Sequence, residues 1–219
     1  MMLTIGLAML QGARHEHAEA LRGAAAELSI DVEIRELRKA SDVEGIDALV
    51  LPGGESTSMK IASRYENLYS AIWEIVESGI PVLGTCAGAI LLCQQKLISA
   101  KIDRNAFGRQ IDSFQASLKV DLGESIEGVE VSAHERDSFG HKPLDVGRQA
   151  AISKEGFPGV FIRAPRFTSI KCDSIAFLDE EVVGIKQDNI VAVTFHPELT
   201  NDRRFHRWLI LQCDDETKI

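Results

Sequence analysis

The stretch IPVLGTCAGAILLCQ, residues 80–94, places an apolar strand (Ile80–Leu83) directly before an apolar helix (Gly88–Gln94). The residues between them are small, and a tight strand-to-helix turn of this kind presents its central side chain, Cys86, on a strained backbone. The N-terminus of the helix favours a thiolate, and the Ala87 N–H can stabilise a negatively charged oxygen. The turn alone is equally compatible with a buried structural cysteine, so a catalytic role requires further residues.

Outward from this turn, the first half of the chain alternates apolar runs with helical patterns. Such alternation is typical of right-handed βαβ crossovers, which give a mainly parallel sheet with helices on both faces. We therefore predict a three-layer α/β fold whose ligands bind at the carboxyl ends of the strands. The expected strands are Leu3–Leu10, Val32–Leu37, Asp47–Leu51 and Ile80–Leu83, and the expected helices are Glu16–Leu28, Thr57–Ser78 (capped by Ser56) and Gly88–Gln94.

The second half contains shorter strand-like runs, for which antiparallel pairing is expected. They are Ser117–Val120, Val160–Ile162, Ser174–Leu178, Val182–Lys186 and Ile190–Phe195, followed by a closing helix near Asp202–Cys213. The charged, glycine-rich stretch Asp121–Gly159 has no clear period, and we interpret it as a surface insertion. The length of 219 residues fits a single domain over residues 1–219.

The amino-acid composition argues against binding to nucleic acid or to a membrane. Lys and Arg number 24 against 33 Asp and Glu, a net charge of −9 that disfavours nucleic acid and anionic lipid as partners. No apolar run is long enough to span a bilayer, and Met1–Leu10, which no basic residue precedes, is interpreted as a buried strand instead of a signal peptide. The four cysteines include no CxxC pair, which fits a reducing compartment, and we expect the protein to be cytoplasmic.

The segment Phe195-His196-Pro197-Glu198 supplies what a cysteine nucleophile lacks. In an extended segment, residues two apart face the same way, so Glu198 is expected beside His196, with Pro197 keeping the segment out of a helix. A carboxylate that fixes the imidazole tautomer prepares His196 to accept a proton from Cys86 and to return it to a leaving amine. The combination favours nucleophilic catalysis over a structural role for each residue.

A second glycine-rich turn, Leu51-Pro52-Gly53-Gly54-Glu55-Ser56-Thr57, follows the strand Asp47–Leu51. Its backbone N–H groups can face an oxyanion, and Glu55 can accept a hydrogen bond from the α-ammonium of an amino-acid substrate. A simple tight turn explains the glycines equally well. Its expected position beside the Cys86 turn, on the same sheet edge, favours the binding role.

The other histidines are His15, His17, His134, His141 and His206. They show neither the Cys/His spacing of zinc sites nor the carboxylate arrangement of other metal sites, so we predict no metal. His15 and His17 are expected to be solvated or helix-start residues.

Together these motifs resemble the class I (triad) glutamine amidotransferases and, within them, the glutaminase subunits of pyridoxal phosphate synthase. The Cys86 turn and His196-Pro197-Glu198 indicate only the broad class, whereas two other segments, Arg104–Gln110 and Phe161–Pro165, single out the subfamily. The matching segments span nearly the whole chain. They are Leu10–Ala13 with Glu16-His17, Leu51–Thr57, Gly84–Leu92, Arg104–Gln110 with Ser113-Phe114, Phe161–Pro165 and Phe195–Leu199.

The resemblance implies the flavodoxin-like fold of that class and a role for each matching residue. Cys86 would be the nucleophile, His196 the acid and base, and Glu198 its orienting carboxylate. Oxyanion stabilisation and activation would involve Gln11, Gly53, Gly54 and Ala87. Glutamine would be bound by Gly54, Glu55, Ser56, Arg104, Ile162 and Arg163, with arginine pairing to the substrate carboxylate.

The resemblance also implies the reaction and the partner. Glutamine would be hydrolysed to glutamate and ammonia, and the ammonia would pass to a (β/α)8-barrel synthase that builds pyridoxal phosphate. This acidic chain has no phosphate-binding loop, so phosphorylated substrates are expected only on the partner and no cofactor on this subunit. Two alternatives stay open: a glutaminase of another amidotransferase pathway, and a non-catalytic binding protein with a cysteine turn on a related α/β fold.

Overall fold

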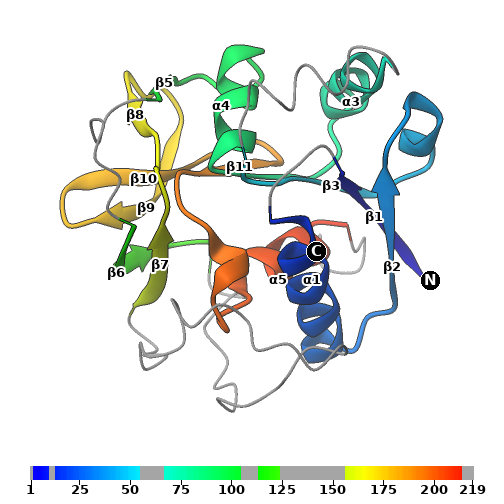
Figure 1. Ribbon diagram of the computed structural model, residues 1–219, viewed down its shortest axis with the longest axis horizontal. Helices are drawn as coiled ribbons and strands as arrows, with labels where there is room; N and C mark the ends of the chain where they lie inside the picture. The colour runs from blue at the N-terminus through cyan, green and yellow to red at the C-terminus, as the bar shows by residue number, and fades with distance from the viewer. Residues whose placement is uncertain (1, 10–12, 55–66, 105–112, 124–155, 214–219) are drawn as a thin grey trace.

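A computed structural model describes residues 2–9, 13–54, 67–104, 113–123 and 156–213 (Figure 1). The strands are β1 (Leu3–Ala8), β2 (Val32–Leu37), β3 (Ala48–Leu51), β4 (Val82–Thr85), β5 (Lys101–Asp103), β6 (Phe114–Val120), β7 (Phe157–Phe161), β8 (Arg166–Thr168), β9 (Asp173–Leu178), β10 (Glu181–Gln187) and β11 (Ile190–Val193). The helices are α1 (Arg14–Leu28), α3 (Leu68–Glu77), α4 (Ala87–Gln94) and α5 (Arg204–Leu211), with 3-10 turns η1 (Ala40–Val43) and η2 (Pro197–Leu199).

Nine of the strands form one mixed sheet in the order β2-β1-β3-β4-β11-β10-β9-β6-β7. The pairs from β2 to β11 are parallel, and those from β11 to β7 are antiparallel. Strands β5 and β8 form a separate antiparallel pair. The predicted α/β class, the mainly parallel first half and the antiparallel second half are therefore confirmed.

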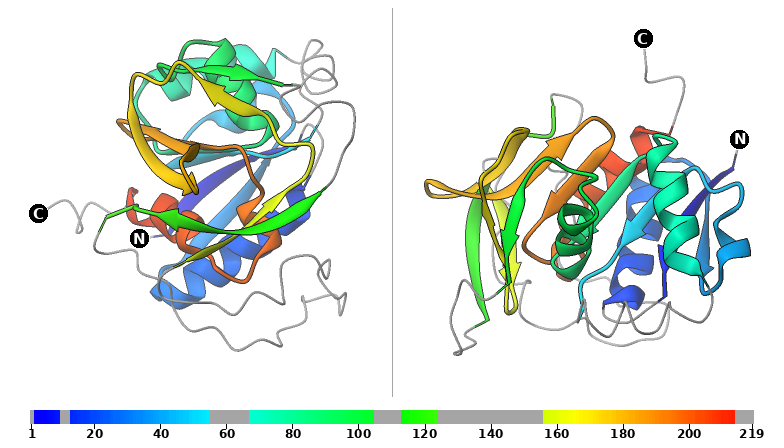
Figure 2. Two further views of the ribbon diagram at one scale, coloured as in Figure 1. Left: turned by 90° about the vertical axis from the view of Figure 1, so that its left-hand side faces the viewer. Right: turned by 90° about the horizontal axis from the view of Figure 1, so that it is seen from above.

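Helices cover both faces of the sheet because its central strands are apolar on both sides (Figure 2). In β3, Ala48 and Val50 belong to the core that includes residues of α1 and α5, whereas Leu49 and Leu51 belong to the core beneath α3 and α4. Strands buried on both faces read as continuous hydrophobic runs, as β3 does. The side chains of alternate residues thus tie one strand to two separate cores.

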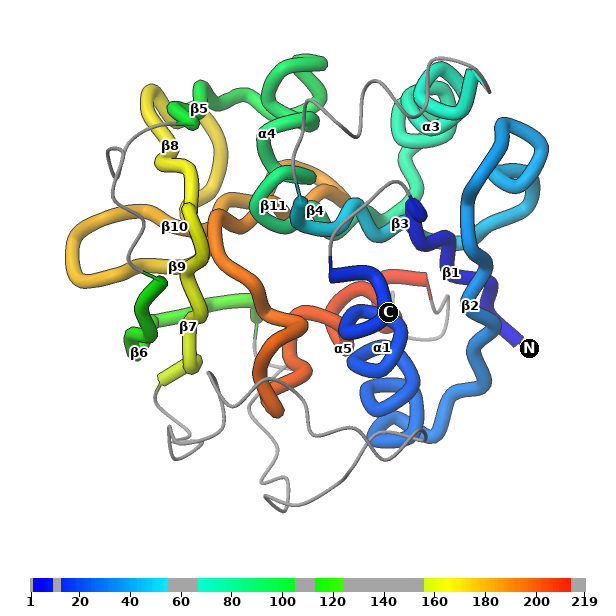
Figure 3. The backbone as a smooth tube through the Cα atoms, in the orientation of Figure 1, coloured from blue at the N-terminus to red at the C-terminus, as the bar shows by residue number. Residues whose placement is uncertain are grey.

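The order of the parallel strands determines where the motifs meet. Strands β3, β4 and β11 are neighbours and point the same way, so the segments that follow them emerge at one edge of the sheet (Figure 3). These segments begin at Pro52, Cys86 and Thr194. The expected meeting of the two glycine-rich turns with the His196 segment follows directly from this topology.

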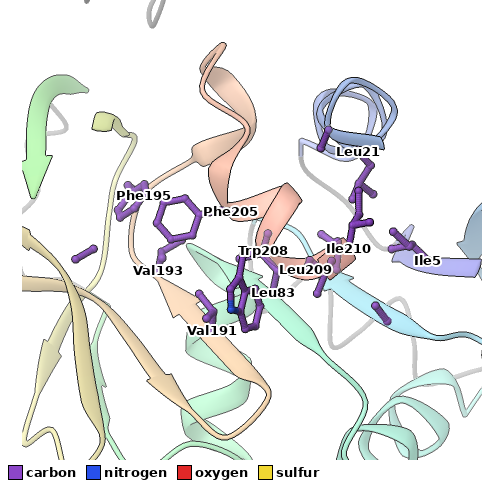
Figure 4. Packing of buried hydrophobic residues seen from close by; sticks show 14 of the residues in the cluster. Ile5, Leu21, Leu83, Val191, Val193, Phe195, Phe205, Trp208, Leu209 and Ile210 are labelled. Carbon is purple, nitrogen blue, oxygen red and sulfur yellow. The ribbon is translucent and has the colours of Figure 1, made fainter. Parts of the chain in front are cut away.

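Aromatic packing anchors the segment that leads to His196. Phe195 is fully buried and lies 5.5 Å from Phe205 between ring centroids, in an edge arrangement. Figure 4 shows Phe195, Phe205 and Trp208 packed in one core with Leu83, Val191 and Val193. Because these side chains join β4, β11 and α5, the backbone before His196 has little freedom to move.

Several predicted boundaries and one local conformation require correction. The first strand ends at Ala8, α1 begins at Arg14, and the short strands β5 and β8 were not predicted. The segment after His196 is not extended: Pro197–Leu199 is a 3-10 turn with Pro197 in its first turn. Proline is compatible with that position because its missing N–H has no helical partner there.

Part of the predicted organisation lies outside the described residues. The second half of the expected helix Thr57–Ser78 is observed as α3, and residues 55–66 are not described. Most of the expected insertion Asp121–Gly159, residues 124–155, is likewise not described. Among the helices that are described, none combines the length and the apolar character needed to cross a bilayer.

Candidate active site

Cys86 occupies the turn between β4 and α4 in the strained conformation that the sequence predicts. Its φ of 47° and ψ of −101° lie in a region that L-residues rarely adopt, and its N–H donates to the Val193 carbonyl at 2.8 Å. A side chain at Gly88 would collide with the Leu51 carbonyl oxygen, so a small residue there lets α4 approach β3. The turn thus holds Cys86 beside β11, at the N-terminus of α4.

His196 and Glu198 form the expected pair, although the backbone between them is a 3-10 turn. His196 Nδ1 lies 2.8 Å from Glu198 Oε1, and both side chains are buried. Cys86 lies close enough to this imidazole to help raise the pKa of His196, and a Cβ at Gly53 would meet both side chains. The thiol, the imidazole and the carboxylate thus lie together.

The electrostatics of the pair favour a charged His196 and a charged Glu198. Burial alone would lower the pKa of His196, but the Glu198 charge and hydrogen bonds with Cys86 and Glu198 raise it to about 10. Burial alone would raise the pKa of Glu198, yet His17 and His196 together lower it to about 2. His196 is therefore well suited to accept and hold a proton.

The glycine turn after β3 packs against this imidazole. A Cβ at Gly53 would meet the His196 ring, 3.0 Å from Nδ1 and closer still to Cε1, and would lie 3.4 Å from Cys86 Cβ. Gly54 has a φ of 149°, which side chains rarely tolerate. The predicted proximity of the Gly53–Gly54 turn and Cys86 is therefore observed.

The residues predicted to bind the substrate come from two further segments. The His196 N–H donates to the Val160 carbonyl at 2.8 Å, so the end of β7, followed by Ile162 and Arg163, lies beside the His196 segment. Arg163 is exposed and has a φ of 46°. Arg104 is also exposed, and it follows Asp103, the partner of Arg166 in the β5–β8 pair. Because Arg104 follows β5 and Arg163 precedes β8, the β5–β8 pairing brings the two arginine segments into the same region of the molecule.

His17 lies in the first turn of α1, as one of its two predicted roles requires, but it is fully buried and so is not solvated, whereas His15 is exposed. Its ring contacts Thr85 Oγ1 at 3.1 Å, His206 Nε2 at 3.0 Å and Glu198 Oε2 at 3.3 Å. The 3.6-residue spacing of His17, Leu21 and Ala24 could have shown this, because it puts His17 on the buried stripe of α1.

The SNO glutamine amidotransferase family matches this chain over residues 7–135 and 128–215. The chain belongs to the SNO glutamine amidotransferase family. The pyridoxal 5'-phosphate synthase subunit PdxT of Thermococcus gammatolerans is 36% identical, and that of Pyrococcus horikoshii is 35% identical. Each alignment covers 95% of this chain and 98% of the relative.

A solved structure supports the same assignment. A crystal structure described as a glutamine amidotransferase has a TM-score of 0.69 to this chain and is 33% identical, covering 95% of this chain and 98% of the other. The expected class I amidotransferase fold is thereby confirmed. Within this family fold, Cys86, His196 and Gly53 occupy the carboxyl ends of three adjacent parallel strands.

Three predicted site residues of this amidotransferase lie outside the described residues: Gln11, Glu55 and Ser56. Ala87 is described, and it is buried as the first residue of α4. Within the described ranges, no cluster of three or more His, Cys, Asp and Glu side chains could hold a metal ion.

Proposed function

We propose that this chain is the glutaminase subunit of a pyridoxal 5'-phosphate synthase and that Cys86, His196 and Glu198 carry out its reaction. The observation that carries the proposal is the placement of Cys86, at a strained turn that opens a helix, beside a His196 side chain that pairs with Glu198. Membership in the amidotransferase family and the 32–36% identity to pyridoxal 5'-phosphate synthase subunits PdxT support the choice of glutamine as substrate.

The geometry suggests how hydrolysis proceeds. His196 takes the Cys86 proton, and the sulfur attacks the side-chain carbonyl carbon of glutamine to give a tetrahedral oxyanion. The C–N bond then breaks as His196 gives its proton to the departing nitrogen. The nitrogen leaves as ammonia, and the γ-glutamyl group stays on Cys86 as a thioester. Water attacks the thioester with its proton passing to His196, and glutamate leaves as the Cys86 thiol is restored. Glu198 stabilises the imidazolium throughout.

The oxyanion needs donors close to Cys86. The Ala87 N–H lies at the start of α4, and the Gly53–Gly54 peptide packs beside Cys86 and His196. We propose that this peptide reorients to present its N–H to the oxyanion when the synthase binds, with Gln11 coupling the two events. Glycine permits such a rotation at little steric cost.

Substrate recognition is assigned to the segments around this centre. Gly54, Glu55 and Ser56 would hold the amino-acid end of glutamine, with Ile162 and the two arginines Arg104 and Arg163 completing the site. Guanidinium groups match carboxylate geometry in a bidentate fashion, which suits the α-carboxylate of the substrate. The exposure of both arginines leaves them available to a ligand.

The partner is proposed to be a (β/α)8-barrel synthase that binds all phosphorylated substrates. The net charge of −9 disfavours phosphate binding on this subunit. Since Cys86 and His196 emerge at the carboxyl edge of the sheet, we propose that the barrel docks there. Ammonia would then pass into the barrel without entering bulk water.

The decisive test is Cys86→Ala, with Cys93→Ala as its matched control. Cys93 lies in α4, the helix that follows Cys86, and burial raises the pKa of its thiol to about 12, which disfavours the thiolate there. Glutamine hydrolysis in the reconstituted complex should be lost in Cys86→Ala and retained in Cys93→Ala. Residual turnover near that of the parent protein in Cys86→Ala would overturn the assignment.

Transfer to the synthase is tested separately with glutamine labelled at the amide nitrogen and competing unlabelled ammonium. Label should enter pyridoxal phosphate, and added ammonium should not dilute it. Dilution in proportion to the added ammonium would contradict the proposed transfer path. Absence of label in the product would contradict the synthase assignment.

A further inference from the structure

The triad carboxylate has a second face that the proposed mechanism does not use. Glu198 Oε1 contacts His196, whereas Glu198 Oε2 is buried and has no hydrogen-bond partner of good geometry among the described residues. His17 Nε2 lies 3.3 Å from Oε2. His17 enters from the first turns of α1, far from Glu198 in sequence.

His17 is held in place by two further contacts. Its Nδ1 lies 3.0 Å from His206 Nε2, and its Nε2 lies 3.1 Å from Thr85 Oγ1. Thr85 is the residue before Cys86, and His206 belongs to α5, which packs beside α1 (Figure 1). His17 thereby links the cysteine turn, the closing helix and the triad carboxylate.

Charge and geometry together determine the tautomers. A lone pair on His17 Nε2 would face the negative Glu198 Oε2 at 3.3 Å, so Nε2 must carry the proton. His17 Nδ1 then accepts from His206 Nε2–H, and His206 Nδ1 carries a lone pair, in keeping with its lack of a hydrogen-bond partner among the described residues. Burial, which lowers the pKa of both rings, keeps them neutral.

A neutral histidine is a costly way to fill a core position. The neighbouring buried residues on its stripe, Leu21 and Ala24, are apolar, and an apolar side chain would fill the site without burying two ring nitrogens. The Nε2 atom of the ring lies 3.1 Å from Thr85 Oγ1 and 3.3 Å from the oxygen of Glu198 that does not contact His196. A specific role toward Glu198 accounts for this arrangement.

We propose that His17 is a positioning residue of the triad: Thr85 and His206 hold its ring so that the Nε2 proton faces Glu198 Oε2 at 3.3 Å. The proposal rests on the proposed function. The positive end of this N–H dipole favours the ionised carboxylate in the orientation in which its other oxygen contacts His196. His17 acts through Glu198 and does not touch the substrate.

Three substitutions separate positioning from packing. His17→Gln keeps an N–H donor near the position of Nε2. His17→Asn keeps a polar group near the position of Nδ1, and with it the bond to His206, but lacks the donor to Glu198. His17→Leu removes both. Melting temperatures measured for each variant identify any that fails to fold, and the Gln and Asn variants test the proposal even if the Leu variant does.

The measurements are kcat and KM for glutamine in the reconstituted complex with the synthase, together with the pH dependence of kcat. In His17→Asn and His17→Leu, kcat should fall on the order of 10–100-fold with KM within about twofold, because only the triad geometry changes. Loss of the donor destabilises the ionised carboxylate, so the acid limb of the pH profile should move upward by about one unit. His17→Gln should restore most of kcat and the parental profile.

Equal kcat values and pH profiles in the Gln and Asn variants would overturn the positioning role. A second readout, independent of glutamine hydrolysis, is the pH dependence of Cys86 alkylation by iodoacetamide in each variant. If the parent complex does not hydrolyse glutamine, the proposed function fails. The alkylation profiles then still show whether His17 acts on the triad, and unchanged profiles would contradict that it does.

Discussion

Glu198 lies between two histidine environments whose pKa values shift in opposite directions. On one side, His196 lies 2.8 Å from Oε1, and its pKa is raised to about 10. On the other side, His17 and His206 are fully buried, and desolvation lowers the pKa of both. The same carboxylate therefore favours a charged imidazole on one side and a neutral one on the other.

The difference follows from how each ring is compensated. His196 receives the charge of Glu198 together with hydrogen bonds to Glu198 and Cys86, and these outweigh its desolvation. His17 has a longer contact with Glu198, and the nearby His196 further disfavours its protonation. A charge on His196 disfavours a charge on His17, so His196 carries the mobile proton and His17 stays neutral.

The largest effect should come from Glu198→Gln, which removes the charge shared by both sides. A neutral amide no longer stabilises the His196 imidazolium, so kcat should fall on the order of 10³–10⁴-fold. The measurement is glutamine turnover in the complex. Glu36→Gln is the matched control because Glu36 is exposed in an edge strand, paired with Arg38, and its kcat should be unchanged. A loss of less than tenfold in Glu198→Gln would mean that the comparison does not bear on catalysis.

Gly53→Ala should disturb the His196 side alone. The new Cβ would press on the His196 ring and displace it from Cys86 and Glu198, so kcat should fall roughly 10–100-fold. Because the His17 side is untouched, the melting temperature should change much less than kcat. Gly45→Ala is the control for backbone strain without a contact at the site: the added Cβ would meet nothing within 4 Å, but φ is +70°, so the melting temperature should fall while kcat stays unchanged. Parental kcat in Gly53→Ala would show that the ring has room to move.

Acid sensitivity should come from the His17 side. The pKa values of His17 and His206 are lowered on folding, so below about pH 6.5 the unfolded chain binds more protons and stability falls, by up to ~1.4 kcal/mol per pH unit for each ring. Glu198 has a pKa of about 2, so its contribution to stability is lost only below about pH 4.5. His196 contributes stability below pH 6.5 that is lost as the pH rises through about 10.

The charged or titratable groups that act on His17 are Glu198, His196 and Glu16. Those that act on His206 are Glu198, Arg203 and Arg207, together with His17.

The measurement is the free energy of unfolding between pH 7.5 and 5 for the parent protein and for His206→Gln, whose amide can donate to His17 but cannot titrate. The slope should be smaller in the variant. An identical slope would place the acid sensitivity elsewhere in the molecule.

The smallest effect is expected from His15→Ala, two residues before His17 on the same helix. His15 is exposed, so the free energy of unfolding should change by no more than about 0.5 kcal/mol. Turnover in the complex should also be unchanged. A large effect on either would mean that burial is not what separates the two histidines.

Short sequence motifs predicted best those parts of the site that are formed by residues close together in the chain. The Cys86 turn and the pairing of His196 with Glu198 were both predicted from short motifs, and the resemblance that those motifs supported identified the family. The prediction of an extended segment at Pro197 was wrong because proline is compatible with both an extended chain and the first turn of a helix. The short strands β5 and β8 were missed because three residues give no measurable period.

The sequence by itself determined the α/β class, the strained cysteine turn, the acid and base that follow β11, and the family. Only the tertiary structure decided that β3, β4 and β11 are neighbours, and that His17 from α1 and His206 from α5 meet behind Glu198. The reason is the distance in sequence over which each feature is specified. The cysteine turn and the His196-Pro197-Glu198 segment are each specified by residues within a few positions. A contact such as that between His17 and His206 depends on how whole helices pack on the sheet, and the pattern of any one segment does not contain that information.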